Sequence, residues 1–148
     1  MCLLCLFVAF QQTLNFRPQT LSLMSHFTTI TTLVRDVAAL RAAVAELGLQ
    51  LLPDAEARGF ASQTRRGDFV IRLKGPYDIA LHRQPNDNYG LTTDWWNGHV
   101  EREVGKDFGR LLQLYGVHKT TLEARKKGLS VLRRQQPNGA IKLVLATL

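Results

Sequence analysis

The sequence predicts a two-layer α+β sandwich, in which a mostly antiparallel sheet carries two helices on one face. Short runs of β-branched and aromatic residues, separated by Gly, Pro and Asn turns, indicate an antiparallel meander. Two longer segments have apolar residues at helical spacing instead. The 148 residues, 45% hydrophobic and 21% charged, suffice for one globular domain. This composition excludes disordered, collagen-like and multi-pass membrane proteins.

The first part of the predicted domain places one helix between two strands. Residues 25–33 are rich in Thr, as a strand can be. Asp36 is positioned to cap the helix that follows. Apolar residues recur in that helix at helical spacing, at Val37, Leu40, Val44 and Leu47. Gly48 ends the helix, and residues 49–52 form a short strand that Pro53 stops.

The middle of the chain predicts a meander. Residues 54–66 indicate a polar loop or hairpin around Gly59. Three strands follow, with turn residues between them, at residues 68–73, 77–83 and 89–94. Sequential strands with short turns are expected to pair antiparallel.

Residues 100–127 predict a long helix with an apolar stripe formed by Val104, Phe108, Leu111, Leu112, Tyr115 and Leu122. We expect Phe108 and Leu111 to be buried against the first helix. Gly109 and Gly116 each weaken the helix by about 1 kcal/mol relative to Ala, so we expect a kink or break near Gly116.

Gly128 is the expected stop of the long helix, after three cations that suit the helix dipole. A final hairpin is then predicted from residues 129–135 and 140–147, across a Pro-Asn-Gly turn.

Residues 1–23 differ from the rest of the chain. The apolar run Met1–Phe10 is too short to span a bilayer, which takes about 20 residues. No Lys or Arg precedes it and no clear cleavage site follows, so it is a weak match to a secretory signal. Organised patterns begin at Met24. We therefore expect residues 24–148 to form a single α+β domain, and residues 1–23 to be a non-native or disordered extension.

Several segments together resemble one known family. They are Met24–Ile30, Leu47–Leu49, Tyr77–Ile79, Asp94-Trp95, Leu114-Tyr115 with His118, Ala124-Arg125 and Gly128. This set is similar to the hypothetical chloroplast reading frame thirty-five family, small proteins of cyanobacteria and algal plastids with a domain of unknown function. The resemblance covers residues 24–148 and departs from the usual pattern at Trp96, Gly116 and the apolar extension. It implies an uncharacterized protein of the cyanobacterial cytoplasm or the chloroplast stroma, and it brings no established activity to carry over.

Positive charge is concentrated near the C-terminus. The chain has 19 Lys and Arg against 12 Asp and Glu, a net charge of +7 and a pI of about 9.9. Residues 24–99 hold eight basic and eight acidic residues, whereas residues 100–148 hold ten basic residues against four acids. Such asymmetry indicates an anionic partner, or alternatively a solvated helix face. The candidate binding residues are Arg125, Lys126, Lys127, Arg133 and Arg134.

Catalytic, cofactor and metal signatures are not found in the sequence, which has no P-loop, GxGxxG, HExxH or nucleophile motif. Cys2 and Cys5 form a CxxC without the second ligand pair that a zinc site needs. Tyr115 and His118 are weak candidates for proton transfer. Trp95 and Trp96 either close the core or offer an aromatic contact for a partner.

The sequence therefore leaves three possible functions, one favoured and two alternatives. We favour a non-catalytic protein-interaction module whose basic C-terminal surface binds an acidic protein surface. The alternative is RNA or DNA binding, although the strands lack the interleaved aromatic and basic residues of a base-stacking sheet. A small enzyme that uses a histidine is the second alternative, and no cofactor is predicted for any of the three.

Overall fold

The structure, a computed structural model, describes residues 4–8 and 27–147. Three helices lie among them: α1 (Val37–Glu46), α2 (His99–Val104) and α3 (Gly109–Lys126). The strands are β1 (Leu4–Val8), β2 (Phe27–Thr31), β3 (Gln50–Arg58), β4 (Thr64–Arg72), β5 (Ile79–Arg83), β6 (Tyr89–Asp94), β7 (Leu129–Gln135) and β8 (Ile141–Thr147). This confirms the predicted α+β class.

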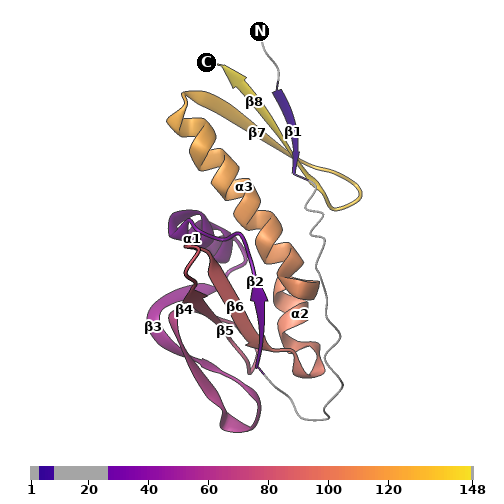
Figure 1. Ribbon diagram of the computed structural model, residues 1–148. Coiled ribbons are helices and arrows are strands. Elements are labelled where there is room, and N and C mark those ends of the chain that lie inside the picture. The colour runs from indigo at the N-terminus through magenta and orange to yellow at the C-terminus, as the bar shows by residue number, and fades with distance from the viewer. Residues whose placement is uncertain (1–3, 9–26, 148) are drawn as a thin grey trace.

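The strands form two antiparallel sheets at opposite ends of α3 (Figure 1). The larger sheet has five strands in the order β2-β6-β5-β4-β3, so β4 to β6 form the predicted meander, β3 extends it at one edge and β2 joins at the other. The smaller sheet has the order β1-β8-β7, and its β7–β8 hairpin lies against the upper half of α3. The final hairpin therefore belongs to a second sheet, which it forms together with β1.

The core lies where α1 and α3 meet one face of the five-stranded sheet. One apolar cluster joins these elements through fully buried side chains. They are Leu40 of α1, Leu111 of α3, Phe108 directly before α3, and Ile71 and Leu81 of the sheet. Ile141 and Leu143 of β8 belong to the same cluster, so the buried side chains of α3 pack in one core with residues of both sheets. The predicted burial of Phe108 and Leu111 is confirmed, in the same core cluster as the apolar residues of α1.

Both ends of α1 follow the sequence prediction. The Asp36 carboxylate accepts hydrogen bonds from the backbone N–H groups of Ala38 (2.9 Å) and Ala39 (3.1 Å), which otherwise lack helical partners. Gly48, at φ +71°, takes the left-handed conformation that follows a helix end.

Two predictions about where elements end are wrong. The strand predicted to stop at Pro53 continues as β3 to Arg58, because β3 is an edge strand where a missing N–H costs no ladder bond. The predicted long helix breaks at Gly105 rather than Gly116. Gly105 has φ +82° and ψ +166°, a conformation restricted to glycine, and it separates α2 from α3.

The predictions for residues 1–23 fall largely outside the described residues. Within that range Leu4–Val8 form β1, which pairs with β8 from Leu4 opposite Leu145 to Val8 opposite Ile141. That residues 1–23 are an extension of a domain formed by 24–148 stays a prediction.

Candidate functional site

The last turn of α3 carries three of the candidate cations. Arg125, Lys126 and Lys127 are exposed, and their charges lie at the negative end of the helix dipole. Lys126 Nζ lies 3.0 Å from Glu123 Oε1. Arg125 and Lys127 form no ion pair with any residue that the structure describes. Gly128, at φ +70°, then turns the chain directly into β7.

Arg133 and Arg134 are adjacent on β7 and therefore point to opposite faces of the strand. Arg133 faces α1, where its Nη2 lies 2.7 Å from Glu46 Oε1. Arg134 is exposed on the outer face, opposite Lys142 in the strand register. β7 runs back along α3. Arg134 follows Lys127 by seven residues, which at about 3.3 Å per residue is a separation of about 23 Å along the extended chain.

The structure thus separates the five predicted cations. Arg133 is engaged by Glu46, whereas Arg125, Lys126, Lys127 and Arg134 follow the outside of the helix end and the hairpin; we call these four the cationic stripe. Leu132 lies on the same face of β7 as Arg134, with 51% of its surface exposed. An exposed apolar side chain therefore lies on the same face as Arg134 of the stripe.

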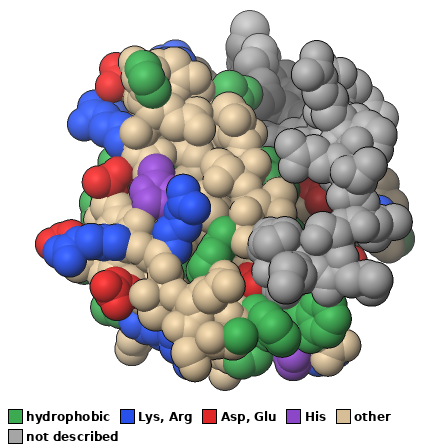
Figure 2. All heavy atoms as spheres, turned by 60° about the horizontal axis from the view of Figure 1, so that its bottom comes forward, with side chains coloured by type: hydrophobic (Ala, Val, Ile, Leu, Met, Phe, Trp, Pro, Cys, Tyr) green, Lys and Arg blue, Asp and Glu red, His purple; other side chains and the backbone are tan. Residues whose placement is uncertain are grey.

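Charge is arranged differently at the opposite end of the molecule. Figure 2 turns the lower end of Figure 1 forward, and on this face Lys and Arg side chains lie among Asp and Glu side chains. Mixed signs of this kind do not build a field of one sign, in keeping with the even count of acids and bases in residues 24–99.

Tyr115 and His118 both connect α3 to α1. The Tyr115 hydroxyl, on a buried side chain, accepts hydrogen bonds from the backbone N–H groups of Arg35 (3.0 Å) and Asp36 (3.1 Å). His118 Nε2 lies 2.7 Å from Glu46 Oε2, so Glu46 contacts Arg133 and His118 through different oxygens. The hydrogen bond from Arg133 is the main reason that the pKa of Glu46 lies below its ordinary value.

The two tryptophans occupy different environments. Trp95 is half-buried against the core, with its ring centroid 4.7 Å from that of Phe108. Trp96 is 46% exposed, and its ring lies 5.3 Å from the exposed ring of Phe60 at the tip of the β3–β4 hairpin. Trp95 therefore helps to close the core, while Trp96 and Phe60 form an aromatic pair at the surface.

Asp78 is the centre of a buried ionic cluster. Its carboxylate is fully buried and receives hydrogen bonds from Arg58 Nε (2.8 Å) and Nη2 (2.8 Å), Arg72 Nη1 (2.6 Å) and the backbone N–H of Leu73 (3.0 Å). Burial alone would raise the pKa of Asp78, but the hydrogen bonds from Arg58 and from backbone N–H groups outweigh it and hold the pKa below its ordinary value. This cluster fixes the β3–β4–β5 corner.

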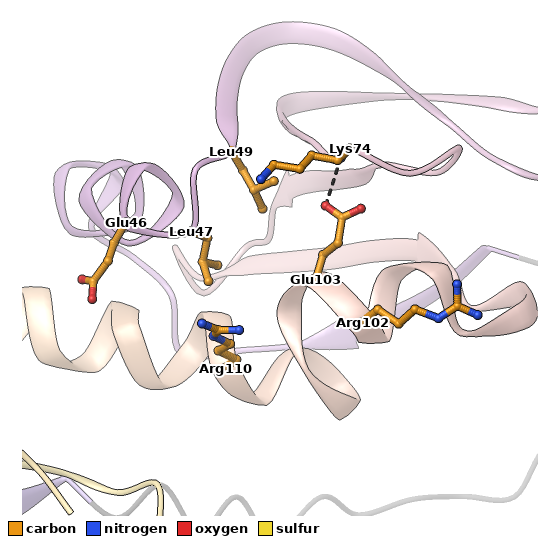
Figure 3. Close-up of a pocket in the computed structure, with 7 residues that line it drawn as sticks. All are labelled: Glu46, Leu47, Leu49, Lys74, Arg102, Glu103 and Arg110. Atoms are coloured by element: carbon orange, nitrogen blue, oxygen red, sulfur yellow. Dashed lines mark hydrogen bonds between the residues drawn. The ribbon is translucent and has the colours of Figure 1, made fainter.

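A cavity of about 250 Å³ lies where α1, the β4–β5 turn, α2 and α3 meet. It is lined by Glu46, Leu47, Leu49, Lys74, Arg102, Glu103 and Arg110. In Figure 3 the side chains of Lys74 and Arg110 approach Leu49 and Leu47 from opposite sides, while Arg102 points away from both leucines. Glu103 accepts hydrogen bonds from the backbone N–H groups of Lys74 (2.9 Å) and Gly75 (2.7 Å), which attaches the turn to α2.

Sequence reasoning missed the residues of this cavity. Its cations and leucines come from four separate elements, so no spacing along the chain brings them together. Leu132 and Phe60 were missed as well, although each had a signal. Leu132 alternates with Ser130 and Arg134 on a polar face, and Phe60 follows the hairpin glycine Gly59.

Among residues 4–8 and 27–147, no three His, Cys, Asp or Glu side chains are grouped so that they could hold a metal ion. Cys2 lies outside the described residues and Cys5 lies in β1. None of the helices described is both long and apolar enough to cross a bilayer.

Fold and surface together define a small α+β protein with a cationic C-terminal hairpin. Residues 43–144, more than half of the chain, match the family described as protein of unknown function (DUF1257). The chain belongs to this family, and the match runs from α1 to β8, so it includes the cavity and the cationic stripe. No curated protein and no solved structure matches the chain.

Proposed function

We propose that this protein is a non-catalytic interaction module that binds an acidic protein surface through the cationic stripe. One observation carries the proposal. After Glu123 the sequence contains six Lys and Arg residues and no Asp or Glu. Arg125, Lys127 and Arg134 in this segment have no ion pair within the described part of the chain, so their charges are free to attract an anionic surface.

An acidic protein fits this surface better than a nucleic acid does. The exposed Leu132, on the same face of β7 as Arg134, offers an apolar contact of the kind that a protein interface uses, whereas a phosphate backbone needs cations only. Residues 129–147 contain no aromatic side chain on which a base could stack. Nucleic-acid binding is therefore treated as an outcome of the test.

The cellular setting belongs to the same proposal. The segments similar to the chloroplast reading frame thirty-five family support the cyanobacterial cytoplasm or the plastid stroma as the place where this partner is met. Sequence likeness alone supports this part.

The test compares two charge-reversal variants of the full chain. The first, Arg125→Glu/Lys127→Glu/Arg134→Glu, reverses the free cations of the stripe. The matched control, Arg41→Glu/Arg65→Glu/Lys106→Glu, reverses three exposed cations elsewhere and changes the net charge equally. Arg58 is unsuitable for the control because it holds the buried Asp78.

Fluorescence anisotropy with labelled polyglutamate and with a single-stranded RNA oligonucleotide measures both partner chemistries. We expect the wild type and the control to bind polyglutamate at least tenfold more tightly than the stripe variant does. Equal losses in both variants would contradict the proposal. Tighter binding of RNA than of polyglutamate, with log affinity falling linearly and steeply against log salt concentration, would replace it with nucleic-acid binding.

A further inference from the structure

The cavity beside α1 has an excess of unpaired positive charge. Glu46 is paired with Arg133 and His118, whereas Glu103 accepts hydrogen bonds from two backbone N–H groups and keeps its negative charge. Lys74, Arg102 and Arg110 line the cavity together with these two acids, so its net charge is positive. The Lys74 ammonium and the Arg110 guanidinium, in contrast, make no hydrogen bond or ion pair with another side chain or carbonyl in the described part of the chain. The cavity therefore has charge available for an anion.

The two free cations are placed to act on one ligand. Figure 3 shows them on opposite sides of the cavity, Lys74 from the β4–β5 turn and Arg110 from the first turn of α3. The turn that carries Lys74 is attached to α2 independently of any ligand, because Glu103 of α2 accepts hydrogen bonds from its backbone. The fold therefore brings both cations to the same cavity.

We propose that this cavity binds a small organic phosphate. A phosphate monoester carries a charge of about −1.5 to −2 at neutral pH, which matches two cations better than a single carboxylate does. A guanidinium offers two parallel N–H groups to phosphate oxygens, and an ammonium adds a compact point charge.

The rest of the cavity limits the size of the ligand. Leu47 and Leu49 form an apolar wall beside the cations, suited to a short carbon chain. The volume of about 250 Å³ lies below the range of about 300–1,000 Å³ typical of larger ligands, so the ligand has few atoms besides its phosphoryl group.

This site is separate from the cationic stripe, since none of Arg125, Lys126, Lys127 and Arg134 lines the cavity. The two proposals therefore fail independently. Loss of phosphate binding in a cavity variant leaves the polyglutamate experiment unaffected, and the stripe variant is expected to bind phosphate as the wild type does.

Isothermal titration calorimetry of the full chain, at constant ionic strength, tests the proposal with glycerol 3-phosphate, inorganic phosphate, succinate and glycerol. We expect saturable binding of glycerol 3-phosphate, weaker binding of inorganic phosphate, at least tenfold weaker binding of succinate, and none of glycerol. Lys74→Ala and Arg110→Ala should each weaken glycerol 3-phosphate binding at least tenfold. Arg41→Ala and Lys106→Ala, which remove exposed cations outside the cavity, should change it less than twofold.

Three results would overturn the proposal. They are the absence of saturable binding at millimolar concentration, succinate binding as tightly as glycerol 3-phosphate, and equal weakening by the cavity and control variants. Because Lys74 and Arg110 are exposed, their variants are expected to keep the wild-type melting temperature. Arg110→Lys adds a check that does not depend on net charge: it keeps the cation but removes the fork, and should still weaken binding.

Discussion

Single residues fix the corners of this fold by giving buried polar groups their partners. Asp78 has no exposed surface, yet its two oxygens receive hydrogen bonds from Arg58, Arg72 and backbone N–H groups on both sides of the corner. Removing one member of such a cluster leaves the others unpaired, which costs more than the intact pair contributes. The partly exposed Arg58 and Arg72 side chains can regain water, but the backbone N–H groups cannot.

Asp78→Ala is therefore expected to lower the free energy of unfolding by about 3–5 kcal/mol. Urea denaturation at pH 7 measures the loss. Asp54→Asn is the control, because it removes the charge of the solvent-exposed Asp54–Arg66 pair while asparagine tolerates the positive φ of 44° at this position, so the denaturation midpoint should be unchanged within error. Equal midpoints for the two variants would contradict the role of the buried cluster.

The contribution of Asp78 to the free energy of unfolding is expected to decrease in acid. Since the folded pKa of Asp78 lies below its ordinary value of about 3.9, its contribution to stability is complete above that pH and is lost as the pH falls through the folded pKa. Asp78→Ala lacks this contribution, so its stability should fall less steeply with acid than that of the wild type.

At the scale of elements, local chemistry determined what could be predicted from sequence. Asp36 and Gly128 act through neighbours in the chain, and both the cap and the helix end were predicted correctly. Pro53 was misjudged because its effect depends on whether its strand is at an edge, which only the sheet order reveals. Gly105 was missed because glycine residues at 105, 109 and 116 look alike in sequence, while only Gly105 takes a positive φ.

Gly105→Ala and Gly109→Ala are therefore expected to have opposite effects. A methyl group at Gly105 would lie 2.8 Å from the Arg110 backbone N and force strain at φ +82°, at a cost of about 1–3 kcal/mol. At Gly109 the added Cβ meets nothing within 4 Å and φ is −54°, so alanine should stabilise α3 by about 0.5–1 kcal/mol. Thermal unfolding measures both. A Gly105→Ala protein that melts at or above the wild-type temperature would contradict this account of the break.

At the scale of the whole molecule, α3 connects two sheets that do not pair with each other. Composition was enough to place positive charge near the C-terminus. It could not show which of these cations form ion pairs within the fold and which are free at the surface. Arg133 turns inward because Glu46, far away in sequence, lies opposite it on α1, and the neighbouring Arg134 turns outward. The cavity was beyond sequence reasoning for the same reason, since it exists only when four elements meet.

Deletion of residues 1–23 tests the division of the chain into extension and domain. β1 lies at the edge of the small sheet and contributes nothing to the pairing of the five-stranded sheet. We therefore expect the shortened chain to unfold in one cooperative transition, with a midpoint lowered by no more than a few degrees. Differential scanning calorimetry measures this, and loss of the cooperative transition would contradict the prediction.

The position of β2 has a consequence for synthesis on the ribosome. Thr29 of β2 meets Thr92 of β6 across a separation of 63 residues, whereas β3, β4 and β5 each pair with the next strand along the chain. At about 5–20 residues per second, β2 leaves the ribosome about 3–13 s before its pairing partner does. During that interval an unpaired Thr-rich strand needs protection, and docking of β2 onto a preformed meander is expected to be the late step of folding.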